Sequence, residues 1–131
     1  MAVEGSQPLK IGTLTASADL SAKQYYFVKI SGSGTVDVCS GATDRPIGVL
    51  QNKPTSGQPA EIVVVGHTKV SCDAALTAGN AIGTSADGQA DAKTAGTDTT
   101  EYIVGVMLRT TGAAAEIGEA LINCASAARG A

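Results

Sequence analysis

The residues that could do chemistry in this chain are few, and they stand apart from one another. His67 is the only histidine, and no serine or cysteine of the chain lies in a nucleophile motif such as G-x-S-x-G. The carboxylates are dispersed over expected turns and strand faces, without the spacing of a calcium loop. The segment Ser31–Thr35 is rich in glycine but lacks the lysine and the spacing of a phosphate-binding loop, which favours a hairpin turn. We therefore expect no enzyme, no catalytic residue, no metal and no cofactor, and a structural role for His67.

The three cysteines are the other candidates for chemistry. Cys39, Cys72 and Cys124 are an odd number of widely spaced residues with no C-x-x-C pair. This pattern favours neither a disulfide framework nor a zinc site. We expect three small buried hydrophobic side chains in a reducing compartment.

Composition excludes several classes of partner. Nine basic and twelve acidic residues give a net charge of -3, and only 3% of the residues are aromatic, so we expect no nucleic-acid binding. The longest apolar runs are far shorter than the roughly 20 residues of a membrane span. The segment Met1–Pro8 has neither the basic nor the apolar region of a signal peptide. We expect no membrane and no small-molecule substrate.

The periodicity of the chain predicts strands. Thr35–Cys39 alternates strictly, so Val36 and Val38 share one face and Asp37 points to the other. Segments of this kind recur between glycine, aspartate, asparagine and serine residues, and no long segment keeps a helical period. The fold class expected is all-β. The expected strands are Lys10–Thr15, Tyr25–Ile30, Thr35–Ser40, Pro46–Gln51, Ala60–Val65, Thr68–Cys72, Glu101–Leu108 and Glu116–Asn123, with weaker candidates at Asn80–Thr84 and Gln89–Ala92.

Short segments of the first half recur in order in the second half, at an offset of about 55 residues. Gly34–Val38 resembles Gly88–Ala92, and Ile47–Leu50 resembles Val104–Met107. We expect one β domain over residues 10–123, built as a small barrel or sandwich from two tandem copies, at about 10–65 and 66–122. The expected N-terminal arm is residues 1–9 and the expected C-terminal tail is residues 124–131. The glycines of the two Gly-Val steps are expected to mark a bulge, a bend or a close approach of another backbone.

The order of these repeated segments resembles that of the phage capsid cement, or head decoration, proteins. The resemblance covers about residues 10–123. It is carried by Thr13–Ala16, Leu20–Ala22, Thr43–Leu50 and Gly57–Val65 in the first copy, and by Leu76–Ile82, Asp87-Gly88 and Tyr102–Met107 in the second. It implies a small β protein of the virion, made in the host cytoplasm, that binds the outer surface of an assembled head. The implied partner is the major capsid protein, whose neighbouring subunits the protein would join.

The composition also favours association with neighbours. Nearly half of the chain is Ala, Gly, Ser or Thr, which leaves a thin core of large side chains. Together with the resemblance, this predicts a homotrimer. Apolar residues in the arm and an aromatic pair are the candidate contacts to the capsid or to another subunit: Val3, Pro8, Leu9, Tyr25 and Tyr26.

Two other functions remain open. A carbohydrate- or peptide-binding β module of a virion fibre or adhesin would need exposed aromatic side chains on one face. A swinging-arm carrier would need a lysine at a hairpin tip between hydrophobic neighbours, and neither Lys53 nor Lys93 has such neighbours. A small hydrolase on the same type of fold would need a nucleophile that the sequence does not offer.

Overall fold

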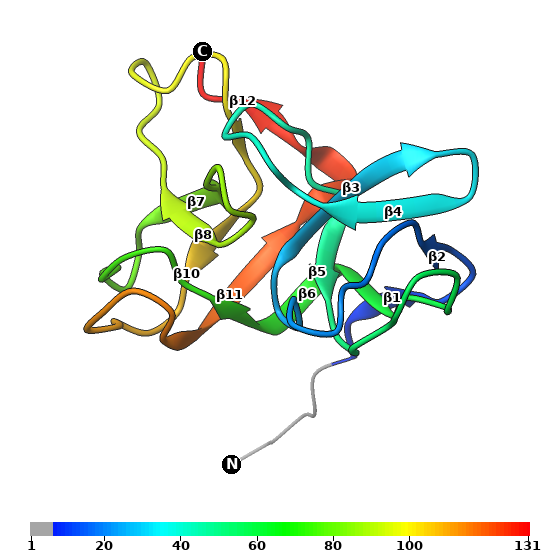
Figure 1. Ribbon diagram of the computed structural model, residues 1–131. Helices are drawn as coiled ribbons and strands as arrows, with labels where there is room; N and C mark the ends of the chain where they lie inside the picture. Colours follow the sequence, from blue (N-terminus) through cyan, green and yellow to red (C-terminus); the bar gives the residue numbers. More distant parts are fainter. Residues whose placement is uncertain (1–6) are drawn as a thin grey trace.

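Strands form nearly all the regular structure of this chain. The computed structural model describes residues 7–131, and over these residues it has twelve strands, one short 3-10 turn and no α-helix (Figure 1). None of the described residues therefore forms a helix that could cross a membrane. The elements are β1 Leu9–Ile11, β2 Thr15–Ala16, β3 Phe27–Gly32, β4 Thr35–Val38, β5 Gly48–Leu50, β6 Ile62–Ser71, β7 Ala81–Thr84, β8 Ala90–Ala92, β9 Tyr102–Ile103, β10 Gly105–Met107, β11 Ile117–Asn123, the turn η1 Cys124–Ser126 and β12 Ala128–Arg129. The all-β prediction is confirmed.

One large sheet carries most of the strands, in the order β2-β4-β3-β5-β6-β11-β10-β7-β8, with β1 also paired to β6. Its centre is the antiparallel pair of β6 and β11, and the two halves of the chain lie on either side of this pair (Figure 1). Of the two architectures expected, a barrel or a sandwich, the barrel is wrong because the sheet is not closed. At each end of the sheet, one isolated bridge connects the outermost strand to a residue near an end of β6. Thr15 of β2 bridges to Pro59, and Ala90 of β8 bridges to Cys72. An isolated bridge is not a hydrogen-bonded pair of strands, so the sheet is curled but does not close into a barrel.

The two halves place their strands in the same order outward from the centre. The first half gives β6-β5-β3-β4 and the second half gives β11-β10-β7-β8. The hairpin registers also correspond, because Lys29 pairs with Asp37 between β3 and β4 as Gly83 pairs with Asp91 between β7 and β8. A tandem duplication would produce this pairing, and the duplication itself stays a prediction.

The sequence repeat also matches Ala60–Ile62 with Ala115–Ile117. It therefore predicts equivalent buried positions for the pairs Ile47/Val104, Val49/Val106 and Ile62/Ile117, but burial differs within these pairs. Val49 is buried, whereas Val106 is only partly buried. Ile62 is buried, whereas Ile117 is 48% exposed. The strand pairing explains the second mismatch: Ile62 lies opposite Leu50, and the residue opposite Met107 is Ala120. Ile117 therefore lies elsewhere along β11, and its expected burial is wrong.

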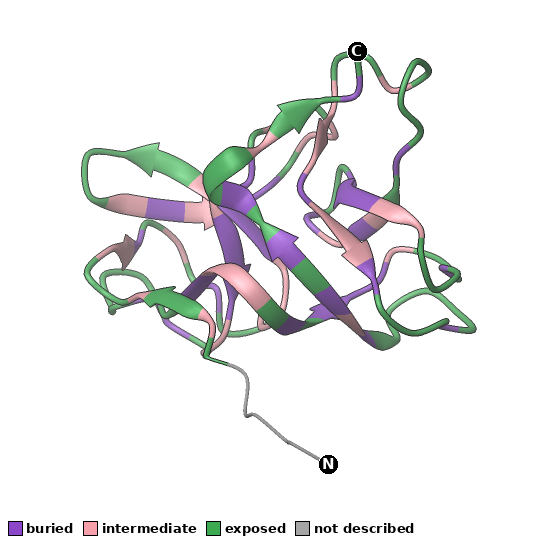
Figure 2. Cartoon of the chain, turned by 180° about the vertical axis from the view of Figure 1, so that it is seen from behind, coloured by how far each residue is buried: buried purple, intermediate pink, exposed green. Residues whose placement is uncertain are grey.

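The core consists of two clusters of buried side chains. Figure 2 marks the buried residues in purple, and many of them lie on the central strands. The larger cluster contains Phe27, Cys39, Val49, Val63, Val70, Cys72, Leu76, Ile82, Ala90, Val104, Met107, Ala120, Ile122 and Cys124. The smaller cluster contains Ala16, Leu20, Val28, Val36, Leu50, Ala60 and Ile62. All three cysteines are buried and free, as the sequence predicts for small hydrophobic side chains.

Gly66 lies within β6, directly after the residues of β6 that pair with β1. This residue has a φ of +126°, which an L-residue rarely adopts, and a Cβ there would lie 2.9 Å from the Cα of Pro8. Strand β1 pairs with β6 up to Val65, and β11 pairs with β6 from Val65 to Ser71. Glycine at this position therefore allows Pro8 and β1 to pack beside the central pair.

The predicted C-terminal tail makes a small sheet of its own with an earlier segment. Strand β12 pairs with β9, and the Arg129 guanidinium lies 5.7 Å from the ring centre of Tyr102. The N–H of Gly96 donates a hydrogen bond to the carbonyl of Gly130. Residues 124–131 therefore contact the loop that leads into β9.

Candidate docking groove

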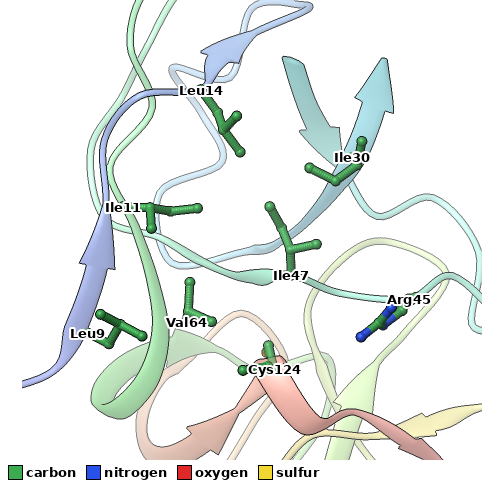
Figure 3. Close-up of a pocket in the computed structure, with 9 residues that line it drawn as sticks. Leu9, Ile11, Leu14, Ile30, Arg45, Ile47, Val64 and Cys124 are labelled. Atoms are coloured by element: carbon green, nitrogen blue, oxygen red, sulfur yellow. The ribbon is translucent and has the colours of Figure 1, made fainter. Parts of the chain in front are cut away.

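An apolar groove opens beside the smaller core cluster, with a volume of about 380 Å³ (Figure 3). Strands β1, β3 and β6 and the turn η1 supply most of its walls. Its lining residues are Leu9, Ile11, Leu14, Ile30, Arg45, Ile47, Val64, Cys124 and Ala125. Four of these, Ile11, Leu14, Ile47 and Val64, are partly buried side chains that also pack against the smaller cluster. The groove is therefore the open continuation of that core.

Two large side chains of the groove are freely accessible. Leu9 is 55% exposed and Ile30 is 52% exposed, which is more than the other exposed large hydrophobic residues, Leu108, Ile117 and Leu121. Leu9 and Ile11 alternate along β1, so their side chains leave the strand on the same face. An exposed apolar surface of this kind is typical of a site that another chain covers.

The groove is continued by a polar hollow at one end. A second cavity, lined by Lys29, Ile30, Asp44, Arg45 and Ile47, shares three of its residues with the first. Arg45 is exposed there and makes no ion pair within the described residues 7–131. The groove therefore has an apolar floor, and the guanidinium of Arg45 lies where it meets the polar hollow.

Asp44, the carboxylate nearest in sequence to Arg45, is already engaged. Its Oδ2 lies 2.8 Å from the Lys29 Nζ and accepts hydrogen bonds from the N–H groups of Ser40 and Gly41. Partial burial alone would raise the pKa of Asp44, but the bond from Lys29 and the backbone donors outweigh it and lower that pKa. The charge of Asp44 is therefore matched locally.

The predicted contact residues lie in different places. Pro8 packs against Gly66, Leu9 lines the groove, and Val3 lies outside the described residues. Tyr25 and Tyr26 are partly buried and do not line the groove. Their rings instead lie beneath lysines, with the Lys69 Nζ 5.8 Å from the Tyr25 centroid and the Lys23 Nζ 4.9 Å from that of Tyr26. The structure brings only Leu9 of these residues to the groove.

Sequence reasoning missed Ile30, Arg45 and Ile47 as residues of one surface. Ile30 and Ile47 belong to strand segments that we expected, and strand periodicity assigns such residues to the core. Their partial or full exposure depends on where the curled sheet ends, which no local pattern records. The one available signal was the run Arg45-Pro-Ile47, where a charged residue comes directly before an apolar segment.

The groups that could do chemistry are distributed outside the groove or are held neutral. The His67 Nε2 lies 3.2 Å from the Oε2 of Glu119 on the neighbouring strand β11, and the Arg109 Nε lies 3.2 Å from the other carboxylate oxygen. The bond with His67, followed by that with Arg109, lowers the pKa of Glu119. Burial raises the pKa values of Cys39 and Cys124 to about 12, so both remain thiols at neutral pH.

The buried Lys93 is paired rather than free. Its Nζ lies 2.8 Å from Glu101 and 3.7 Å from Asp91. Within the described part of the chain, no group of three His, Cys, Asp or Glu side chains has the arrangement of a metal site. These side chains offer structural ion pairs, and the groove offers a surface for contact.

Comparison with known proteins gives a likeness at the level of structure. No family model and no curated protein sequence matches the chain. Among solved structures, the chain is similar to the N base of the head fiber gp8.5 of bacteriophage phi29, with a TM-score of 0.63 and 11% sequence identity. The similarity covers 92% of this chain and 96% of that chain. It extends over nearly the whole of both chains and establishes that they share a fold.

Proposed function

We propose that the chain is a structural protein of a phage virion that attaches to the outer surface of the assembled head. The observation that carries the proposal is the fold shared with the N base of a phage head fiber over nearly the full length of both chains. The repeated motifs, which resemble those of head decoration proteins, support the same assignment independently. The proposed partner is the major capsid protein, and the proposed state is a homotrimer that bridges neighbouring capsid subunits.

The proposed mechanism is stabilisation by binding and requires no catalysis. A protein that binds only the assembled shell favours that state over separated subunits by mass action. Each occupied site adds contact area across a seam between subunits, which internal pressure tends to open. The exposed apolar side chains of Leu9 and Ile30 and the charge of Arg45 support a role in such contacts. We propose no metal, cofactor, small-molecule substrate, nucleic acid or membrane as a partner.

A carbohydrate- or peptide-binding module of a virion fibre is the second candidate. The comparison favours this candidate in one respect, because the similar structure is part of a head fiber. The aromatic side chains disfavour carbohydrate as the ligand: Tyr25, Tyr26 and Tyr102 are partly buried, Phe27 is fully buried, and none lines the groove. Attachment to the head is therefore the better supported function.

The decisive experiment uses virions of the phage that encodes this chain. Wild-type particles are compared with particles in which the gene is deleted, by electron cryomicroscopy and by release of DNA on heating. We expect density for the chain outside the shell in wild-type heads only, and DNA release at a lower temperature in the deletion particles. Localisation inside the head or on the tail, or an unchanged release temperature, would contradict the proposal.

A further inference from the structure

We propose that the apolar groove binds residues Met1–Ser6 of a second copy of this chain, so that neighbouring copies exchange N-terminal segments. This inference concerns contact between copies and does not depend on attachment to a capsid. It rests on the groove, on the residues that precede β1 and on the path of the chain into β1.

The groove requires an occupant with apolar side chains and one negative charge. Leu9 and Ile30 stand about half exposed along an apolar floor, where covering them would remove apolar surface from water. Arg45 lies at the polar end and has no carboxylate partner within residues 7–131. Asp44 is held by Lys29, so the free charge of this end is positive.

The segment Met1–Ser6 has the complementary pattern. In an extended chain, Met1 and Val3 lie on one face and Glu4 lies on the other, so the Glu4 carboxylate would meet Arg45 at the edge of the groove and not on its apolar floor. Six extended residues span roughly 20 Å, which is long enough to cross from one copy to the next. The order of side chains, two apolar residues and then an acid, matches the order of the floor and the guanidinium.

The path into β1 favours the groove of a second copy over the chain's own groove. Leu9 forms a wall of the groove and is also the first residue of β1, paired with Val65. Pro8 is fixed against Gly66 and restricts Gln7 to extended backbone. Because Gln7 is extended and leads away from Leu9 along the chain, a segment that entered its own groove would have to reverse direction at Gln7 and Pro8.

Disulfide trapping on the full-length chain tests the inference. The double variant Val3→Cys/Ile30→Cys places one thiol in the segment and one at an exposed groove position, while the native cysteines remain buried. The matched control is Val3→Cys/Leu108→Cys, because Leu108 is similarly exposed, at 44%, and does not line the groove. Both proteins are oxidised mildly and separated on a non-reducing gel, after circular dichroism has shown wild-type strand content.

We expect covalent dimers and larger multimers from the groove variant and few from the control. A disulfide forms only when the two Cα atoms approach within about 7 Å, so the reaction reports the contact itself. A monomer with an internal disulfide would show that the segment binds its own groove, which overturns the exchange. Equal multimer formation in the control, or no cross-link in either protein, overturns it as well.

Charge reversal in the variant Val3→Cys/Ile30→Cys tests the proposed ion pair between Glu4 and Arg45. Glu4→Lys alone and Arg45→Glu alone should each lower the multimer yield about 5-fold, as expected for an exposed ion pair, and the combination should restore it. A combination that is as weak as the single variants would contradict the pairing of Glu4 with Arg45.

Discussion

Single glycines set the distance between the central strands of this sheet. At Gly48, a Cβ would collide with the Ile62 side chain and the Val63 carbonyl, and at Gly105 it would lie 2.5 Å from the Leu121 carbonyl. Both glycines therefore mark a close approach of the neighbouring strand, which was one of the alternatives open from the sequence.

Alanine at either glycine should destabilise the fold by forcing these strands apart. We expect Gly48→Ala and Gly105→Ala each to lower the free energy of unfolding by about 1–3 kcal/mol, the usual cost of overpacking. Urea unfolding followed by circular dichroism measures the change. Gly12→Ala is the control, since a Cβ there meets nothing within 4 Å, and equal losses at Gly12 would contradict the steric explanation.

The Lys29–Asp44 pair should make stability depend on acidity. Because the folded protein lowers the pKa of Asp44 below its ordinary value of 3.8, the unfolded chain takes up this proton first as the pH falls. The contribution of Asp44 is therefore complete well above pH 3.8 and is lost as the pH falls through the folded pKa. The variant Asp44→Asn should be less stable than wild type near neutral pH and should lose less stability on acidification.

Urea midpoints of both proteins at several pH values measure this difference. The control is Asp87→Asn, because none of the described ion pairs involves Asp87. If the wild-type and Asp44→Asn profiles ran parallel from neutral to acid pH, the pair would not contribute as described.

Strands β5 and β10 occupy corresponding places in the two halves but differ in burial. Val49 is completely buried in the larger core cluster, whereas Val106 is partly exposed. We therefore expect Val49→Asp to cost about 3–5 kcal/mol, comparable to the whole stability of a small domain, because it leaves an unpaired carboxylate in the core. Val106→Asp should cost clearly less, although the repeat by itself predicts that either substitution is severely destabilising. The soluble fraction and the thermal midpoint of each variant measure this, and equal losses would contradict the difference in burial.

Local patterns predicted strands well where the period was clear. The alternation of Thr35–Cys39 and the glycine turn before it correspond to the β3–β4 hairpin, and Asp87-Gly88 lies in the turn between β7 and β8. Elements that depend on distant pairing were not predictable. The segment Glu101–Leu108 is divided at Val104, whose N–H donates to Ile82, and β6 continues through Gly66 where the sequence suggested two strands.

The residues of the candidate groove also divide into those that a local pattern predicts and those that depend on contacts between distant segments. Leu9 was predicted as a contact residue because an apolar residue precedes the first repeated unit, which is a local signal. Ile30, Arg45 and Ile47 join it only because the curled sheet brings β1, β3 and the segment before β5 together. A surface made by contacts between distant segments leaves no periodic trace in the sequence.

The two halves of the molecule share one of the core clusters, so neither half is complete alone. Phe27 of the first half is buried in the larger cluster among residues of the second, and its N–H donates to the carbonyl of Gly88. We expect a fragment of residues 7–65 to remain unfolded by itself, because it would expose Phe27 and Val63. Circular dichroism and proton NMR of the isolated fragment measure this. A cooperative unfolding transition of the fragment would show instead that each half is an independent domain.

The whole molecule should associate into a homotrimer in solution. The core is built from few large side chains, while Leu9, Ile30, Leu108, Ile117 and Leu121 are each about half exposed. Removing such side chains from water adds stability that the thin core of one copy does not supply. Light scattering over a range of micromolar concentrations should give a mass three times the 13.0 kDa of the single chain. The variant Leu121→Lys, which places a charge on the exposed face of β11, should shift the mass toward the monomer if that face lies between subunits. A wild-type protein that stayed at 13.0 kDa across the whole range would contradict a trimer formed before the protein meets any partner.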